Sequence, residues 1–268
     1  MKKTTGFAIA GVCAAVIAGI YFWGEELVEI EPVSADVFRV IENVEIPVYD
    51  REAEIVEHTA YSFQYNEQHE QADWVAYTLI NDMLNNEIER SDDFRVDTMV
   101  STGSAELSDY RRSGYDRGHL APAADMKITE ETMSESFYMS NMSPQKPGFN
   151  RGVWKRLEEQ VRDWASIYDT LYIVTGPVLE DELNTIGENE VSIPNKYYKA
   201  LLVYKMDIQS AIGFILENES SSEELKSFAV TIDSVEKLTS IDFFEKLPDG
   251  FENQIESTLK IFDWFTAD

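Results

Sequence analysis

A histidine stands directly after Asp-Arg-Gly in the stretch SGYDRGHLAPAADM, residues 113–126. Gly118 permits a sharp backbone turn beside it, and Arg117 places a permanent cation two residues before His119. Asn150 follows further along the chain. A neutral imidazole takes a proton from water near pH 7, and an amide oxygen is a hard ligand for Mg²⁺. With arginines to stabilise charge on phosphorus, this set of residues suits metal-assisted phosphodiester hydrolysis.

The other two histidines lack such neighbours, and we interpret both as structural residues. His58 lies in an acidic segment, and His69 stands at the start of a predicted amphipathic helix. Two aspartates could also be taken for metal ligands. We expect Asp116 to hold the loop of the motif and Asp125 to be structural.

Several blocks along the chain resemble the DNA/RNA non-specific endonucleases with a ββα-metal active site, a family that includes mitochondrial endonuclease G and secreted bacterial nucleases. One block is YDRGHLAPAADM, residues 115–126. A second, SFYMSNMSPQKPGFNRGVWKRLEEQVR at residues 136–162, carries the family's Ser-Asn-x-x-Pro-Gln, Asn-x-Gly-x-Trp and Leu-Glu patterns in order. Weaker similarity extends the resemblance from about Thr59 to Trp264.

The resemblance implies the chemistry of three residues. The general base of the family falls on His119 and its direct metal ligand on Asn150. Glu158 matches an acidic residue near the water molecules of the metal. The implied cofactor is Mg²⁺, with Mn²⁺ as an alternative, and the implied reaction is attack of activated water on phosphorus that leaves 5′-phosphate ends.

The resemblance also implies supporting residues. Arg117 matches the arginine of the signature, and Asn141 would help to hold the site. An upstream arginine that contacts the scissile phosphate falls on Arg90. Because the alignment has one extra residue nearby, Arg95 is the alternative.

The order of the predicted elements indicates an α+β fold. Strands and helices alternate without a regular βαβ rhythm, which favours a central mixed or antiparallel sheet flanked by helices; the resemblance implies the ββα-metal endonuclease fold. Helices are predicted over residues 69–84, 149–168 and 234–244, where Ser234 would cap the last of them. Strands are predicted over residues 94–100, 170–179, 197–206, 211–218 and 227–232.

The charge of the chain opposes a polyanionic substrate. Its 268 residues carry a net charge of −28, which repels nucleic acid at long range. Residues 146–162 carry five basic and two acidic residues. We therefore expect a basic strip on the catalytic helix to receive phosphates, made of Lys146, Arg151, Lys155, Arg156 and Arg162. Cys13 is the one cysteine, which excludes an intramolecular disulfide.

The N-terminus carries a membrane signal. Two lysines precede the apolar run of residues 6–23, which ends in Tyr-Phe-Trp. Bulky residues at that end favour an uncleaved transmembrane helix over a cleaved signal peptide. We therefore expect an anchor or signal segment at residues 1–24, an acidic tether at 25–54 and the nuclease domain at 55–268. The domain would be exported to the periplasm or the cell exterior, with secretion after cleavage as the alternative.

The expected partners are DNA and RNA substrates and, through the anchor, the membrane. The resemblance also leaves open a homodimer and an inhibitor protein of unknown identity. Two other functions compete with the nuclease. One is a non-catalytic nuclease-like binding module, and the other is a phosphodiesterase that acts on small substrates in a closed pocket.

Overall fold

A seven-stranded sheet forms the centre of the computed structural model, which describes residues 41–51 and 53–265. The strand order is β1-β2-β3-β6-β9-β10-β11, and every neighbouring pair is antiparallel. This agrees with the predicted α+β class. The strands of the sheet are β1 Ile55–Glu57, β2 Ser62–Asn66, β3 Gln71–Ile80, β6 Thr170–Pro177, β9 Lys196–Tyr204, β10 Gln209–Glu217 and β11 Ala229–Val230.

Within the described residues, two short hairpins and six α-helices surround this sheet. The hairpins are β4 Asp116–His119 with β5 Met142–Gln145, and β7 Thr185–Ile186 with β8 Val191–Ser192. The helices are α1 Leu107–Tyr110, α2 Glu130–Glu135, α3 Lys155–Tyr168, α4 Ile232–Thr239, α5 Asp249–Ser257 and α6 Ile261–Trp264.

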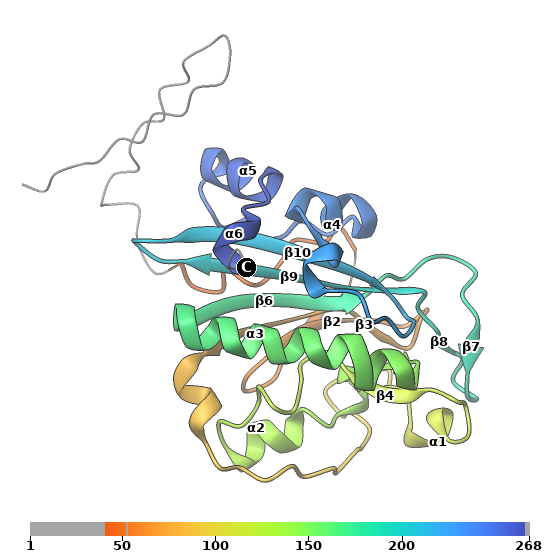
Figure 1. Cartoon of the computed structure of the whole chain (residues 1–268). Helices are drawn as coiled ribbons and strands as arrows, with labels where there is room; N and C mark the ends of the chain where they lie inside the picture. The colour runs from red at the N-terminus through yellow and green to blue at the C-terminus, as the bar shows by residue number, and fades with distance from the viewer. Residues whose placement is uncertain (1–40, 52, 266–268) are drawn as a thin grey trace, which may run out of the picture. The chain divides into compact units, whose positions relative to one another are not determined.

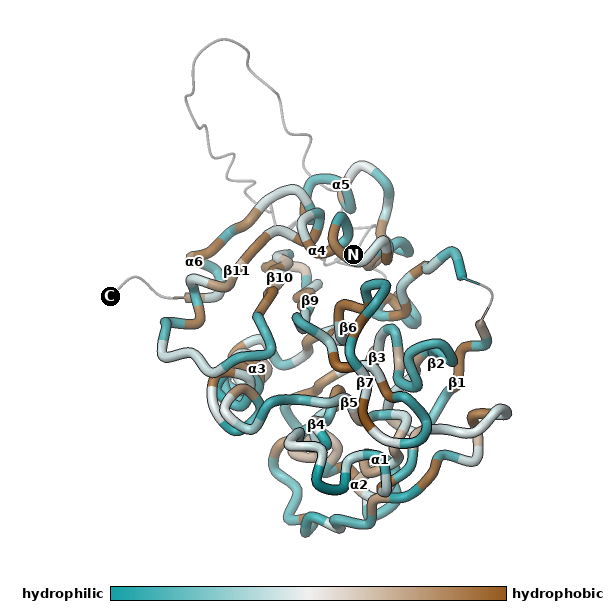
Figure 2. The backbone as a smooth tube through the Cα atoms, turned by 90° about the vertical axis from the view of Figure 1, so that its right-hand side faces the viewer, coloured by the Kyte–Doolittle hydropathy of each residue, from teal (hydrophilic) through white to brown (hydrophobic). Residues whose placement is uncertain are grey.

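Both faces of the sheet are buried. Helix α3 crosses one face, whereas α4 and α5 cover the other (Figure 1). Because side chains alternate along a strand, β3 contributes to two cores: Val75 and Tyr77 pack with residues of α3, and Trp74 and Ala76 pack with residues of α4 and α5. Figure 2 shows hydrophobic stretches along β3, β6 and β10, between these layers.

The predicted helix over residues 69–84 is wrong. Strand β3 crosses the centre of the sheet there, and a short 3₁₀ turn at Asn81–Asn85 follows it. A strand buried on both faces has a nearly continuous apolar sequence, and such a run also contains helical spacings. The β-branched and aromatic residues Trp74, Val75 and Tyr77 favour the strand.

The other predicted elements are confirmed with shifted ends, apart from one. Strands β6, β9 and β10 lie where the sequence predicts them. Helix α4 starts earlier than predicted, and Thr231 caps it by accepting a hydrogen bond from the Ser234 amide. The predicted strand over 94–100 is reduced to a bridge between Arg95 and Tyr138.

The folded domain includes residues that the sequence assigned to the tether. Val44 is buried against the core beneath α4 and α5, and Val48 pairs with Asp242 as an isolated bridge. Residue 55 is therefore too late a start for the domain. The anchor expected at residues 1–24 lies outside the described residues. Within 41–51 and 53–265, the structure has no helix of the length and apolarity needed to span a bilayer.

Candidate active site

Two antiparallel strands and a helix position the predicted residues. In the hairpin of β4 and β5, His119 lies opposite Met142 and Gly118 opposite Ser143. A Cβ at Gly118 would lie 2.1 Å from Cδ of Gln145, so the two strands can approach only with glycine there. The chain then enters a π-helical turn at Phe149–Trp154, which continues into α3.

A hydrogen-bonded carboxylate ties this turn to β4. Asn150 Nδ2 donates to Asp116 Oδ2 at 3.0 Å, and Arg151 donates to both carboxylate oxygens of Asp116 at 2.8 and 2.6 Å. The backbone of Gly152 leaves helical geometry just after them, with φ −111° and ψ −109°. Burial alone would raise the pKa of Asp116, but the hydrogen bonds from Arg151 and Asn150 outweigh burial and lower it. Asp116 therefore holds the motif as a charged group.

The imidazole of His119 is held between two aromatic rings. Its ring centroid lies 4.9 Å from that of Phe137 and 5.9 Å from that of Phe94, both in edge-on geometry. Its Nε2 atom is buried without a hydrogen-bond partner. Burial, together with the positive charges of Arg90 and Arg117, lowers the pKa of His119 to about 3. The imidazole is therefore uncharged near neutral pH.

A cavity of about 480 Å³ is lined by Phe94, which contacts the His119 ring; His119 itself is not among the lining residues. The guanidinium of Arg117 sits 4.0 Å from the centroid of Phe94, and that of Arg90 sits 4.6 Å from the centroid of Phe137. The two rings that hold His119 thus also hold the two cations. The cavity is lined by Arg90, Asp92, Phe94, Leu107, Tyr110, Arg111, Tyr115, Asp116, Arg117, Asn150 and Arg151.

The two upstream arginines occupy different positions. Arg90 lines the cavity, whereas Arg95 does not. The Arg95 guanidinium donates to Asp93 Oδ2 and to the Ser134 carbonyl, each at 2.8 Å. It also lies 3.9 Å from the centroid of the Tyr138 ring. The geometry therefore favours Arg90 as the residue that reaches a bound phosphate.

Asn141 holds the segment that follows His119. Its side chain is buried and forms a closed set of hydrogen bonds. Oδ1 accepts from the Ala121 amide at 2.9 Å, and Nδ2 donates to the carbonyls of Ala121 and Ser136, each at 2.9 Å. Asn141 does not line the cavity. Its place is therefore structural support for the base.

Glu158 lies in the first turn of α3 and outside the cavity lining. Burial raises its pKa to about 7, against the opposing attraction of Lys199. Lys199 itself is buried, and its Nζ lies 4.9 Å from the Trp154 ring without a hydrogen-bond partner. Burial lowers the pKa of Lys199 to about 8. Sequence reasoning missed Lys199, although a lysine within the apolar run of β9 was a visible signal.

The remaining histidines and Asp125 have structural partners. His58 has a buried carboxylate partner: its Nε2 lies 2.8 Å from Asp97 Oδ2. His69 is buried outside any helix, with Nδ1 2.9 Å from Ser192 Oγ. Asp125 is buried and accepts hydrogen bonds from Tyr77 and Arg162, so it is structural as expected.

The predicted basic strip is not a free cationic surface. Lys146 pairs with Glu219, and Lys155 lies 3.5 Å from Glu159 on its own helix. Partners far away in the sequence neutralise most of the strip. Arg151 is the member of the strip that lines the cavity, and it does so together with Arg90, Arg111 and Arg117, of which sequence reasoning did not place Arg111 in the site.

Comparison with known proteins identifies the family of this chain. Residues 41–250 match the family model described as DNA/RNA non-specific endonuclease. The chain belongs to the DNA/RNA non-specific endonuclease family. It is therefore a nuclease.

Named relatives agree with this assignment. Nuclease C1 of Cunninghamella echinulata var. echinulata is 36% identical over 211 residues, which cover 72% of this chain and 84% of that protein. Human mitochondrial endonuclease G is 31% identical over 206 residues, covering 71% and 69%. Mitochondrial nuclease 1 of Schizosaccharomyces pombe is 35% identical over 177 residues, covering 59% of this chain and 55% of its own length.

A solved structure shares the fold. A chain from the crystal structure of an EndoG/EndoGI complex, described as showing the mechanism of EndoG inhibition, superposes with a TM-score of 0.69 at 30% identity. The match covers 75% of this chain and 89% of that chain.

Proposed function

We propose that this nuclease is a magnesium-dependent endonuclease that cuts the phosphodiester bonds of both DNA and RNA and leaves 5′-phosphate ends. The observation that carries the proposal is the environment of His119. A neutral imidazole with an unpartnered nitrogen lies beside Arg90 and Arg117, which line a cavity together with the Asn150 amide. A base, two phosphate-binding cations and a hard oxygen ligand are the parts that this reaction needs.

The donor set fits a hard cation that keeps most of its water. Asp116 engages Nδ2 of Asn150, which leaves Oδ1 as the ligand end of the amide. One protein oxygen and several waters suit Mg²⁺, and Mn²⁺ accepts similar ligands. When bound, the ion supplies positive charge beside the phosphate. Glu158 lies outside the cavity lining and would act through water.

Side chains of the protein have the other roles in the reaction. His119 accepts a proton from the attacking water, and Asn141 keeps the histidine segment in place through its bonds to Ala121. Arg90 and Arg117 neutralise the charge that develops on the phosphate. Burial lowers the pKa of His119 in the free protein, and the same two cations lower it further. A bound phosphate offsets them, so the base becomes stronger as the substrate arrives.

Substrate choice follows from the lining. Four arginines offer contacts to phosphates, which are common to DNA and RNA and carry no sequence information. Arg111 and Arg151 are exposed, so the chain of a long substrate can continue past the cavity. That favours a polymer over a small phosphodiester in a closed pocket. A non-catalytic binding module has no need of an unpartnered buried base.

The test is digestion of matched single- and double-stranded DNA and RNA in Mg²⁺, in Mn²⁺ and in EDTA. We expect cleavage of all four substrates with either metal and none in EDTA. The products should be substrates for a ligase without prior phosphorylation, since that requires 5′-phosphate ends. Cleavage that persists in EDTA would contradict the metal requirement, and products with 5′-hydroxyl ends would contradict the direction of bond breakage.

We also propose that residues 1–24 anchor an exported nuclease domain, on the basis of the apolar run and its preceding lysines. Fractionated cells should then retain the intact chain in membranes, with the domain open to protease from the outer side. A soluble form that begins near residue 24 would instead indicate cleavage of a signal peptide.

A further inference from the structure

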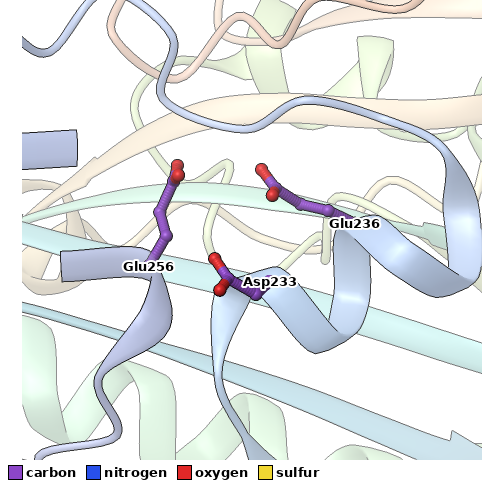
Figure 3. Close-up of side chains that lie close together, drawn as sticks. All are labelled: Asp233, Glu236 and Glu256. Carbon is purple, nitrogen blue, oxygen red and sulfur yellow. The ribbon is translucent and has the colours of Figure 1, made fainter. Parts of the chain in front are cut away.

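Five carboxylates gather on the sheet face that α4 and α5 cover, opposite to α3 (Figure 1). Asp233 and Glu236 come from α4 and Glu256 from α5, and one carboxylate oxygen of each lies within 4.8 Å of the others (Figure 3). Asp242 and Glu252 form a second such group with the same Glu256. We call these five residues the carboxylate cluster.

Glu256 is a buried acid at the centre of this cluster. It is 6% exposed, and its Oε1 is buried without a hydrogen-bond partner. Its side chain points toward those of Asp233 and Glu236 (Figure 3). Oε1 of Glu252 is also buried without a partner. A buried carboxylate without a counter-charge is costly, so this arrangement calls for a cation or for protons.

The charges around these acids are of their own sign. Burial and the neighbouring carboxylates, Glu236 foremost, raise the pKa of Glu256 to about 9. Burial and other carboxylates, led by Asp242, raise the pKa of Glu252 to about 7. The groups that act most strongly on both residues are thus further acids rather than lysines or arginines. None of these neighbouring side chains supplies a positive charge to balance the two carboxylates.

The placement of these acids on helices α4 and α5 is also electrostatically unfavourable. Glu252 and Glu256 stand four residues apart on α5, and Asp233 and Glu236 stand three apart on α4. Like charges at these spacings destabilise a helix. Glu256 further lies in the last turn of α5, where the helix dipole disfavours a negative charge. A bound cation would reverse all of these penalties.

We propose that the carboxylate cluster holds a divalent cation of the calcium type, with Glu256 as its central ligand. Calcium binds six to eight oxygens at about 2.3–2.6 Å, so two of its ligand oxygens lie at most about 5 Å apart. In each of the two groups the carboxylate oxygens lie within 4.8 Å of one another, which is inside that limit. Magnesium needs shorter bonds and a stricter octahedron, and it releases its waters reluctantly.

The ion would join three segments of the domain. Helices α4 and α5 supply ligands directly. Asp242 adds the segment between them, and its backbone exchanges two hydrogen bonds of 2.9 Å with Val48 near the start of the described chain. Glu236 already accepts a hydrogen bond from the Phe243 amide at 2.9 Å in this segment. The cation thus acts as a structural clamp on the face of the sheet remote from α3.

Protons compete with the cation for this cluster. The pKa of Glu256 is about 9 in the folded protein and near 4.5 in an ordinary environment. Between these values the folded state binds more protons than the unfolded state, so the stability of the cation-free protein falls as pH rises. Cation binding must displace those protons, and its affinity therefore rises with pH.

Thermal unfolding of the full chain after EDTA treatment tests the proposal at pH 8. Calcium chloride is compared with sodium chloride of equal ionic strength. The proteins are the wild type, Asn150→Ala, which removes the metal ligand proposed for the active site, Glu256→Gln, and the control Asp163→Asn on an exposed residue of α3. At roughly 100 times its Kd, calcium should raise the Tm by about 5–10 °C.

We expect this rise in the wild type, in Asn150→Ala and in Asp163→Asn, and its loss in Glu256→Gln. Without calcium, Glu256→Gln should melt at or above the wild-type temperature, because the amide is neutral without having to bind a proton. A calcium shift that is absent from Asn150→Ala would overturn the proposal. So would an equal shift in Glu256→Gln, or a sodium chloride shift as large as that of calcium.

Calorimetric titration provides a second readout that does not require Glu256→Gln to fold. Calcium is titrated into Asn150→Ala at pH 6 and pH 8. Binding should be tighter at pH 8 and should release protons, as the heat in buffers of different ionisation enthalpy reports. Absence of binding at both pH values would rule out the site.

Discussion

Asn150 and Asp116 are joined by a 3.0 Å hydrogen bond from Nδ2 to Oδ2, which fixes the start of the catalytic helix to the strand that carries His119. Arg151 binds the same carboxylate through two further hydrogen bonds. The relative position of the proposed base and metal ligand therefore depends on a residue that touches neither the phosphate nor the metal in our account. Asp116 is a positioning residue.

Asp116→Asn should weaken metal binding because a neutral amide holds Asn150 and Arg151 less firmly. We expect the Mg²⁺ concentration for half-maximal activity to rise about 10- to 100-fold, as is typical when the partner of a metal ligand is changed. Saturating Mg²⁺ should recover most of the activity. The measurement is a Mg²⁺ titration of plasmid cleavage, with Asp163→Asn as the control. An unchanged Mg²⁺ requirement would show that the contact is incidental.

The two upstream arginines should behave differently. Arg90→Ala removes a cation from the cavity and should lower kcat/KM by about 10²-fold, the usual scale for a charge-stabilising contact. Arg95→Ala should change kcat/KM little, because Arg95 does not line the cavity. Steady-state cleavage of a fluorescent duplex gives both values. The reverse ranking would assign the phosphate contact to Arg95.

Much of this site could be predicted from local sequence motifs. Contacts between residues far apart in the sequence could not be predicted in this way. The Asp-Arg-Gly-His block forms a short strand and the Asn150 block a π-helical turn, and both are local in sequence, so their residues could be named in advance. Strand β3 could not be assigned, because burial on both faces removes the alternation that marks a strand. The prediction of a free basic strip was wrong because Lys146 pairs with Glu219, which lies far along the chain. Lys199 was missed because the acid nearest to it in charge effect, Glu158, lies on helix α3, far away in the sequence.

The pH profile should not follow an ordinary histidine. His119, with a pKa of about 3, stays neutral throughout the range in which the protein is stable, so no loss of kcat/KM should occur near pH 6.5 on its account. Glu158, with a pKa of about 7, is protonated below that pH. If its carboxylate is the active form, kcat/KM rises through pH 7, and Mg²⁺ moves this rise to lower pH.

The variant Glu158→Gln distinguishes the contribution of Glu158 to the pH profile from that of His119. The rise through pH 7 should disappear in this variant, while some activity remains, since Glu158 does not line the cavity. The profile is measured as kcat/KM from about pH 5 to 9, at two Mg²⁺ concentrations. A rise that persists unchanged in Glu158→Gln would belong to another group.

Salt dependence should reflect a cationic cavity in an acidic protein. Salt weakens phosphate contacts, but it also screens the long-range repulsion from a net charge of −28. The initial rate on plasmid should therefore vary little, or pass through a maximum, between roughly 10 and 500 mM salt. A steep monotonic fall would mean that the acidic surface does not affect binding.

Arg111 offers a matched comparison for the cavity. Arg111→Gln should raise KM for long DNA more than it changes kcat, because Arg111 lines the cavity. Arg112→Gln alters the adjacent exposed arginine, which does not line it, and should leave KM near that of the wild type. Equal effects of the two changes would indicate a diffuse charge effect rather than a contact.

The central claim is that His119 is the base of the reaction. The most direct measurement is single-turnover cleavage of duplex DNA by His119→Ala at saturating Mg²⁺, with circular dichroism and thermal unfolding to show that the fold is retained. Loss of a general base typically costs about 10²- to 10⁴-fold, and we expect a loss of at least that size with DNA affinity largely kept. Cleavage by folded His119→Ala at a rate close to that of the wild type would contradict the account.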